Sequence, residues 1–185
     1  MLPIIQKSDP ILKRKAKDVS LKQFGSEELF RLIQEMKETL RTQEDGVALA
    51  APQIGSPLRI FVVAPRVFEI QRELKNEKRA NENEEIATSS DEHLVYINPT
   101  LTKLSRKKRL VDEGCLSIRN YYGKVSRAEK ATVEAYDEYG KKFTRGGTDL
   151  LAQIFQHEVD HLNGTLFIDK AEDLYYLPQQ PPKKK

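Results

Sequence analysis

The chain has 185 residues, of which 38% are hydrophobic and 32% are charged, and its formal net charge is +3. This length favours one domain spanning residues 1–185, and the nearly balanced charge argues against a DNA-binding protein. No apolar run reaches the length of a membrane span, and the N-terminus lacks the features of signal and transit peptides. A single cysteine excludes an internal disulfide, so we expect a cytoplasmic protein with no membrane partner.

The first strongly patterned segment lies in the first quarter of the chain. Ser26 followed by Glu27 and Glu28 is typical of a helix start, because acidic side chains are favourable near the positive end of the helix dipole. Apolar residues then recur at helical spacing from Leu29 to Leu40. We therefore predict an amphipathic helix whose apolar side lies in the core.

Residues 46–55 form a run of small residues that contains one amide side chain, Gln53, and a short buried strand is predicted at residues 59–64. Small residues beside a strand allow another backbone to approach closely. That backbone is either a neighbouring strand of the same protein or an extended peptide ligand. The sequence leaves both alternatives open.

Residues 69–93 differ in composition from the segments around them. Their first half could form an exposed helix, and the polar, acidic residues 80–92 predict a mobile surface insertion. His93, at the edge of this insertion, is expected to be solvated rather than to bind a ligand. Strand character resumes from Leu94 to Ile97 and is expected to end at the Asn-Pro pair that follows.

The central part of the chain predicts strands joined by polar connections. Residues 103–109 are strongly basic, and a solvated connection is favoured over an RNA-binding patch. Alternating apolar residues predict a strand over residues 127–136, followed by a hairpin turn at residues 137–140. The return strand begins at residue 141, and the Gly-Gly pair at residues 146–147 is expected to break it.

A stretch near the C-terminal end contains the pattern His-Glu-x-x-His on a predicted helix. Residues four apart share a helix face, so His157 and His161 can offer two imidazole nitrogens to one metal ion. Glu158 is then placed to take a proton from a water that the ion activates. The alternative is two histidines on a polar helix face. Residues 166–168 predict a last strand, and residues 178–185 predict a disordered tail.

The only cysteine, Cys115, is a candidate third ligand. Thiolate is a soft ligand that suits zinc or iron, and three protein ligands with one position left for water are usual in catalytic zinc sites. Alone, this cysteine is more often a buried structural residue. Beside His157 and His161, the ligand role is favoured.

Three motifs occur in order along the chain, GVALAAPQ at residues 46–53, EGCLS at residues 113–117 and QHEVDH at residues 156–161. Together they resemble the peptide deformylase family, whose members remove the N-formyl group from newly made polypeptides. The resemblance extends from residues 9–12 to residues 164–167 and covers nearly the whole chain. It implies an α+β fold in which small antiparallel or mixed sheets pack around a central helix that carries the His-Glu-x-x-His motif.

The resemblance also implies the roles of single residues. Cys115, His157 and His161 would bind one divalent metal, typically Fe²⁺, which Zn²⁺, Ni²⁺ or Co²⁺ can replace. Glu158 would act as base towards the attacking water and then as acid towards the leaving amine. The other implied catalytic residues are Gln53 and Leu116, which would donate hydrogen bonds to the formyl oxyanion. The residues that would bind the substrate are Val47, Ala48, Gly114 and Ile154. Glu113 and Arg127 would form a supporting ion pair.

The chain departs from the family pattern at two places near this site. Ala48 stands where the family usually has Gly, and residues 119–122 replace a segment in which many members have Pro. The expected partners are nascent N-formylmethionyl peptides. Two alternatives remain. A His-Glu-x-x-His endopeptidase is disfavoured by Cys115 and Gln53, and a catalytically impaired, ribosome-associated binding protein is motivated by Ala48 and the basic tail.

Overall fold

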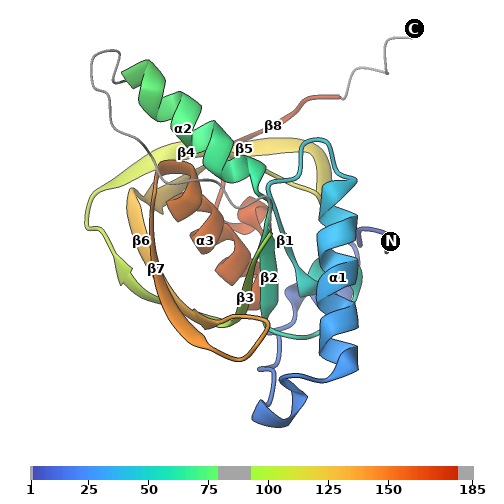
Figure 1. The fold of residues 1–185 in the computed structure, drawn as a ribbon. Helices are drawn as coiled ribbons and strands as arrows, with labels where there is room; N and C mark the ends of the chain where they lie inside the picture. Colours follow the sequence, from blue (N-terminus) through green and yellow to red (C-terminus); the bar gives the residue numbers. More distant parts are fainter. Residues whose placement is uncertain (1, 79–92, 179–185) are drawn as a thin grey trace, which may run out of the picture.

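The computed structural model describes residues 2–78 and 93–178 (Figure 1). Its helices are α1 (Glu27–Arg41), α2 (Arg66–Lys78) and α3 (Asp149–Leu162). Its strands are β1 (Ala48–Ala50), β2 (Ile60–Val63), β3 (Leu94–Leu104), β4 (Lys108–Cys115), β5 (Ile118–Ala128), β6 (Lys130–Tyr136), β7 (Lys142–Thr148) and β8 (Glu172–Tyr176). The predicted insertion at residues 80–92 and nearly all of the predicted tail lie outside the described residues.

The strands form two sheets around α3, in the orders β1-β2-β3-β6-β7 and β4-β5-β8. Every pairing between named strands is antiparallel. Helix α3 contacts β1, β3, β6 and β7 of the larger sheet and β5 of the smaller one, and Figure 1 shows it enclosed by them. The predicted α+β fold with a central helix is therefore confirmed, and its sheets are antiparallel rather than mixed.

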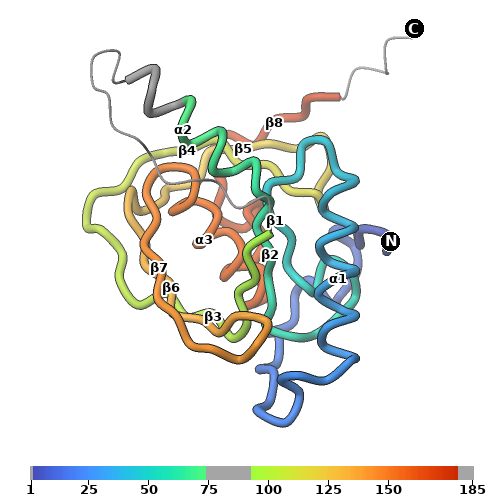
Figure 2. The backbone as a smooth tube through the Cα atoms, viewed as in Figure 1, coloured from blue at the N-terminus to red at the C-terminus, as the bar shows by residue number. Residues whose placement is uncertain are grey.

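The larger sheet is buried on both faces where β1, β2 and β3 pair. Alternate residues of a strand point to opposite faces, and the backbone trace in Figure 2 shows α3 on one side of these strands and α1 on the other. The sheet residues in one cluster with α3 are Ala48, Ala50, Phe61, Val63 and Tyr96. Those in one cluster with α1 are Leu49, Ile60, Val62, Val95 and Ile97. Two cores thus fix the position of β1.

Helix α1 confirms the amphipathic helix expected from the sequence. The Ser26 side chain accepts a hydrogen bond from the Leu29 backbone N–H, so the hydroxyl caps the first turn. The buried residues Leu29, Ile33, Met36 and Leu40 follow the helical spacing. No helix in the described part of the chain is long and apolar enough to cross a membrane.

The predicted end of a strand at Asn98 is wrong, because β3 continues through this position to Leu104. Asn98 has a positive φ of 50°, and the pairing with β6 changes register between Ile97 and Thr100. The Asn98 side chain bonds both backbone groups of Val19, at 2.8 Å each. This contact with the N-terminal segment stabilises the irregularity, so the strand resumes beyond it.

The predicted break at Gly146 and Gly147 is also wrong, since β7 runs through both residues. A Cβ atom on Gly147 would lie 3.0 Å from side-chain atoms of Leu151 and Phe155. The glycine therefore allows α3 to pack closely on β7.

The C-terminal segment differs from its prediction as well. Phe167–Asp169 forms a 3-10 turn rather than a strand. The last strand is β8, which follows this turn and pairs with β5.

Gly164 ends α3 with a positive φ of 75°, and a Cβ atom there would lie 2.6 Å from the Lys13 carbonyl oxygen. We expect Gly164→Ala to lower the free energy of unfolding by at least about 1–2 kcal/mol, the usual cost of a left-handed backbone for an L-residue. Gly146→Ala is the matched control, because among the described residues nothing lies within 4 Å of the added atom. Equal denaturant midpoints for the two variants would contradict the packing of α3 against the N-terminal segment.

Candidate metal site and cleft

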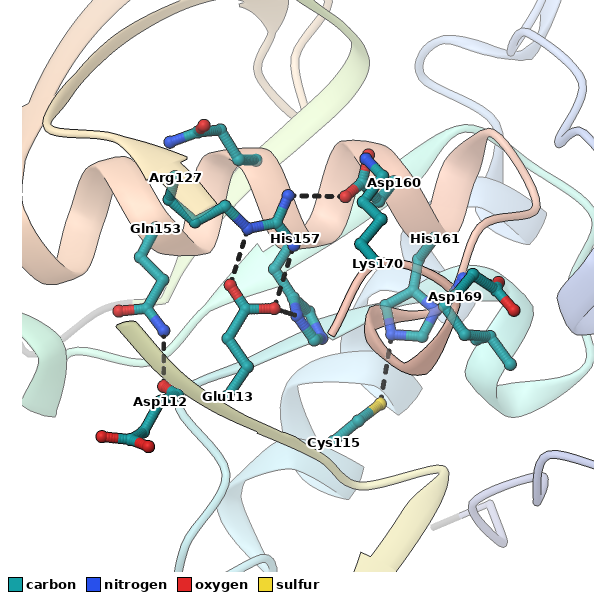
Figure 3. A network of polar contacts seen from close by, with 12 residues as sticks. Asp112, Glu113, Cys115, Arg127, Gln153, His157, Asp160, His161, Asp169 and Lys170 are labelled. Atoms are coloured by element: carbon teal, nitrogen blue, oxygen red, sulfur yellow. Dashed lines mark hydrogen bonds and ion pairs between the residues drawn. The ribbon is translucent and has the colours of Figure 1, made fainter. Parts of the chain in front are cut away.

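Helix α3 and the end of β4 bring three potential metal ligands together. His157 and His161 lie one turn apart on α3, with ring centroids separated by 4.9 Å. Cys115 Sγ lies 3.2 Å from His161 Nε2, as Figure 3 shows. The donor atoms of all three residues lie within 4.8 Å of one another. The three residues that the sequence selected as ligands thus form one cluster.

The chemistry of this cluster fits a divalent transition metal. A thiolate and two imidazoles suit Zn²⁺ or Fe²⁺, and three ligands leave room for water or substrate. Burial alone would raise the pKa of Cys115, but the charge of His161 and hydrogen bonds from the histidines lower it to about 5. The pKa of His157 is raised despite its burial, because it contacts Cys115 and Glu113. The cluster therefore stabilises positive charge at the place where a cation would sit.

A second layer of charged residues holds His157 in place (Figure 3). Glu113 Oε2 lies 3.0 Å from His157 Nδ1, which leaves Nε2 of that ring for the ligand position. Arg127 donates two hydrogen bonds to the Glu113 carboxylate, at 2.7 and 2.9 Å. Burial opposes ionisation of Glu113, but the hydrogen bonds from Arg127 and His157 outweigh it and lower the Glu113 pKa to about 2. The ion pair expected from the sequence is confirmed.

The network extends to two residues that the sequence prediction missed. Arg127 Nη1 also contacts Asp160 at 2.6 Å, and Lys170 Nζ contacts the other Asp160 oxygen at 2.7 Å. Asp160 occupies a variable position of His-Glu-x-x-His, so only the longer motif QHEVDH at residues 156–161 could have indicated it. Lys170 lies only ten residues beyond Asp160, but no motif of the sequence indicates this contact.

Glu158 is buried beside the cluster with an oxygen atom left unused. Within the described part of the chain, Glu158 Oε2 and His161 Nδ1 are buried without a hydrogen-bond partner. Burial raises the pKa of Glu158 to about 7, although the nearby histidines act in the opposite direction. A carboxyl group that gains and loses a proton near neutral pH suits general acid–base chemistry.

Gln53 directs its amide nitrogen towards Cys115. It lies in the 3-10 turn Ala51–Ile54, and its Oε1 accepts a hydrogen bond from the Ala50 backbone N–H at 2.8 Å. Gln53 Nε2 then donates to Ser117 Oγ at 3.1 Å and approaches Cys115 Sγ at 3.4 Å. The bond to Ala50 thus fixes the side-chain orientation that presents a donor to the site.

A cavity of about 270 Å³ opens beside the cluster. Its lining includes every residue that the sequence predicted to contact the substrate or the oxyanion: Val47, Ala48, Gln53, Gly114, Leu116, Ile154 and Glu158. Strand β1 pairs with β2 on one side and borders this cavity on the other, so close packing within the sheet is confirmed and the approach of a peptide ligand stays a prediction.

The cavity lies between the edges of the two sheets. Strand β1 is an edge strand of the larger sheet and β4 an edge strand of the smaller one, and both contribute lining residues. Edge strands carry unpaired main-chain groups that can bond an extended peptide. Asp45 and Arg119, which the sequence prediction did not pair, form an ion pair of 2.9 Å at this lining.

His93 and the basic segment lie outside this site. His93 is half-buried rather than solvated, in a hollow lined in part by Lys37 and Arg41 of α1. Burial and then the charge of Lys37 lower its pKa. Of the basic residues 103–109, the first two end β3, the last two begin β4, and residues 105–107 form the predicted connection between these strands.

Comparisons with known proteins agree with the fold and identify a family. The family model described as polypeptide deformylase matches residues 1–175. Peptide deformylase 1A, chloroplastic/mitochondrial, of Arabidopsis thaliana is 38% identical over 90% of this chain and 60% of its own length. The peptide deformylase of Christiangramia forsetii is 38% identical over 94% of this chain and 83% of its own.

A solved structure is similar over nearly all of both chains. The class I type b peptide deformylase from Acinetobacter baumannii, bound to Met-Ala-Ser, has a TM-score of 0.74 and 32% sequence identity. The match covers 92% of this chain and 99% of the other. The chain therefore belongs to the polypeptide deformylase family.

Proposed function

We propose that this chain is a metal-dependent hydrolase that removes the formyl group from the N-terminal formylmethionine of newly made peptides. The observation that carries the proposal is the cluster of Cys115, His157 and His161 at the side of a cleft between two sheet edges, with the buried Glu158 next to it. Membership of the polypeptide deformylase family supports the reaction. The similar A. baumannii enzyme, which binds Met-Ala-Ser, supports a peptide beginning with methionine.

Cys115, His157 and His161 would hold one divalent ion, with Fe²⁺ as the ion that the family resemblance favours. When bound, such an ion polarises a carbonyl group and lowers the pKa of water. Glu113 contributes indirectly, because its bond to His157 Nδ1 orients that ring.

Glu158 would move the protons of the reaction. Its unpartnered Oε2 takes a proton from the water that adds to the formyl carbon. The same carboxyl group then gives this proton to the methionine nitrogen as the C–N bond breaks. The products are formate and a peptide with a free amino group.

Gln53 Nε2 and the Leu116 backbone N–H would donate hydrogen bonds to the oxygen of the formyl group as it gains negative charge. Both residues line the cavity, and Gln53 is already held with its nitrogen towards Cys115. Donors fixed in advance need no reorganisation during the reaction, which is why such groups stabilise the transition state.

The substrate backbone would lie between β1 and β4. Val47 and Ala48 border it on one side and Gly114 on the other, so the peptide would add a strand between the two sheets. Ile154, one turn before the ligands on α3, would line the pocket for the methionine side chain. Ribosome association and a cytoplasmic location stay predictions from the sequence and from the proposed nascent substrate.

Glu158→Gln keeps the size of the side chain but removes its basic oxygen, so we expect the kcat for deformylation of formyl-Met-Ala-Ser to fall on the order of 10²–10⁴-fold. Release of the free amine by anaerobically purified, Fe²⁺-loaded protein is the measurement. Glu28→Gln, at an exposed glutamate on α1, is the control and should keep wild-type activity. Full activity in the metal-loaded Glu158→Gln variant would exclude Glu158 as the base. A folded, metal-loaded wild type that releases no amine would overturn the proposed function.

His161→Ala and Cys115→Ser should each lower the affinity for the metal at least about tenfold, because losing even an outer-shell partner costs 10–100-fold. Elemental analysis after dialysis against a weak chelator gives the metal content per chain. His93→Ala is the matched control, since this histidine lies away from the cluster. Metal contents that are equal in all three variants would contradict the ligand assignment.

A further inference from the structure

A row of residues crosses the smaller sheet and ends at the cavity. Gly114 on β4 pairs with Tyr122 on β5, and Tyr122 pairs in turn with Tyr175 on β8. Directly paired residues on neighbouring strands present their side chains on the same face of a sheet. Gly114, Tyr122 and Tyr175 therefore share one face, and we refer to them as the aromatic row.

Gly114 allows the Tyr122 ring to reach the cavity. A Cβ atom on Gly114 would lie 2.7 Å from Tyr122 Cε1, so the ring covers the space that a side chain of β4 would occupy. Both Gly114 and Tyr122 line the cavity. The Tyr122 ring thus extends over β4, the strand that borders the substrate cleft.

Tyr175 supports the Tyr122 ring from behind. The two rings are stacked, with centroids 5.9 Å apart and planes inclined by 24°. Tyr175 is 43% exposed and lies at the surface of the protein. Stacked aromatic pairs of this kind contribute beyond the apolar area that they bury. Tyr175 therefore acts through Tyr122 as a positioning residue.

The aromatic row faces away from α3. Glu113, one residue before Gly114, points towards α3 and contacts His157. Successive residues of a strand point to opposite faces, so Gly114 and the residues paired with it lie on the outer face. If a peptide added as a strand beside β4, its side chains would also alternate between the inner face, towards α3, and the outer face.

The geometry points to a specificity-determining role for this row, which rests on the proposed deformylase function. If the methionine side chain lies towards Ile154 on α3, the next side chain of an extended substrate points to the outer face, where the Tyr122 ring lies. We therefore assign Tyr122, supported by Tyr175, as the wall that contacts the second residue of the substrate. An aromatic ring favours a large apolar side chain there, above all an aromatic one.

The test compares kcat/KM for formyl-Met-Phe-Ser and formyl-Met-Ala-Ser with the Fe²⁺-loaded protein. We expect the wild type to prefer the Phe peptide about two- to tenfold, the range typical of one aromatic pair. Tyr122→Ala and Tyr175→Ala should bring this ratio close to one, whereas Tyr175→Phe should keep it because the ring remains. A ratio measured on one protein sample is insensitive to a partial loss of folded enzyme.

Tyr139→Ala is the matched control. Tyr139 is a 76% exposed tyrosine in the turn between β6 and β7, and it does not line the cavity. This variant should keep the wild-type ratio. The assignment would be overturned, and the proposed function kept, by either of two results. In the first, the wild type turns over both peptides with a kcat/KM ratio near one. In the second, Tyr122→Ala and Tyr175→Ala leave the wild-type ratio unchanged. No turnover of either peptide would overturn the proposed function and the assignment with it.

Discussion

The proposed metal site depends on one buried ion pair that joins two parts of the fold. His157 and His161 come from α3, whereas Cys115 comes from β4, and metal coordination requires their donor atoms to meet within a few tenths of an ångström. The ion pair of Glu113 and Arg127 links these parts, because Glu113 precedes Cys115 by two residues and also bonds to His157. The hairpin that carries the cysteine is thereby held against the helix by contacts between protein side chains.

This ion pair is better understood as a positioning device than as a source of stability. Both side chains are at most 5% exposed, so each charge has lost most of its hydration. Removing two charges from water costs about as much as their attraction returns, and a buried pair is therefore weak evidence for stability. What the pair does provide is directional bonding: two parallel bonds fix the carboxylate, and that carboxylate fixes one imidazole. Arg127 also pairs with Asp160, and Asp160 pairs with the more exposed Lys170, so opposite charges alternate from Glu113 to the surface.

The sequence predicts features that depend on local pattern or on the chemistry of single residues. Helix α1 follows from its apolar spacing and cap, and the two histidines follow from their separation on one helix. Cys115 could be placed with them because it is the only cysteine in the chain and its thiolate is a soft ligand that suits zinc or iron. The sequence wrongly ended one strand at Asn98 and broke another at Gly147. Strand β3 continues past Asn98 because that residue bonds to Val19, and β7 continues through Gly147 because the glycine makes room for side chains of α3. No local pattern contains those contacts.

The two faces of β4 and β5 are constrained in different ways. On the inner face, Glu113 and Arg127 meet His157 and Asp160, and changing either residue would disturb the metal ligands. On the outer face, the Tyr122 ring lies over Gly114 and stacks on the ring of Tyr175. Substitution there can alter the wall of the cleft without moving the ligands. Because strand residues alternate between faces, one hairpin can keep its chemistry fixed while its substrate preference changes.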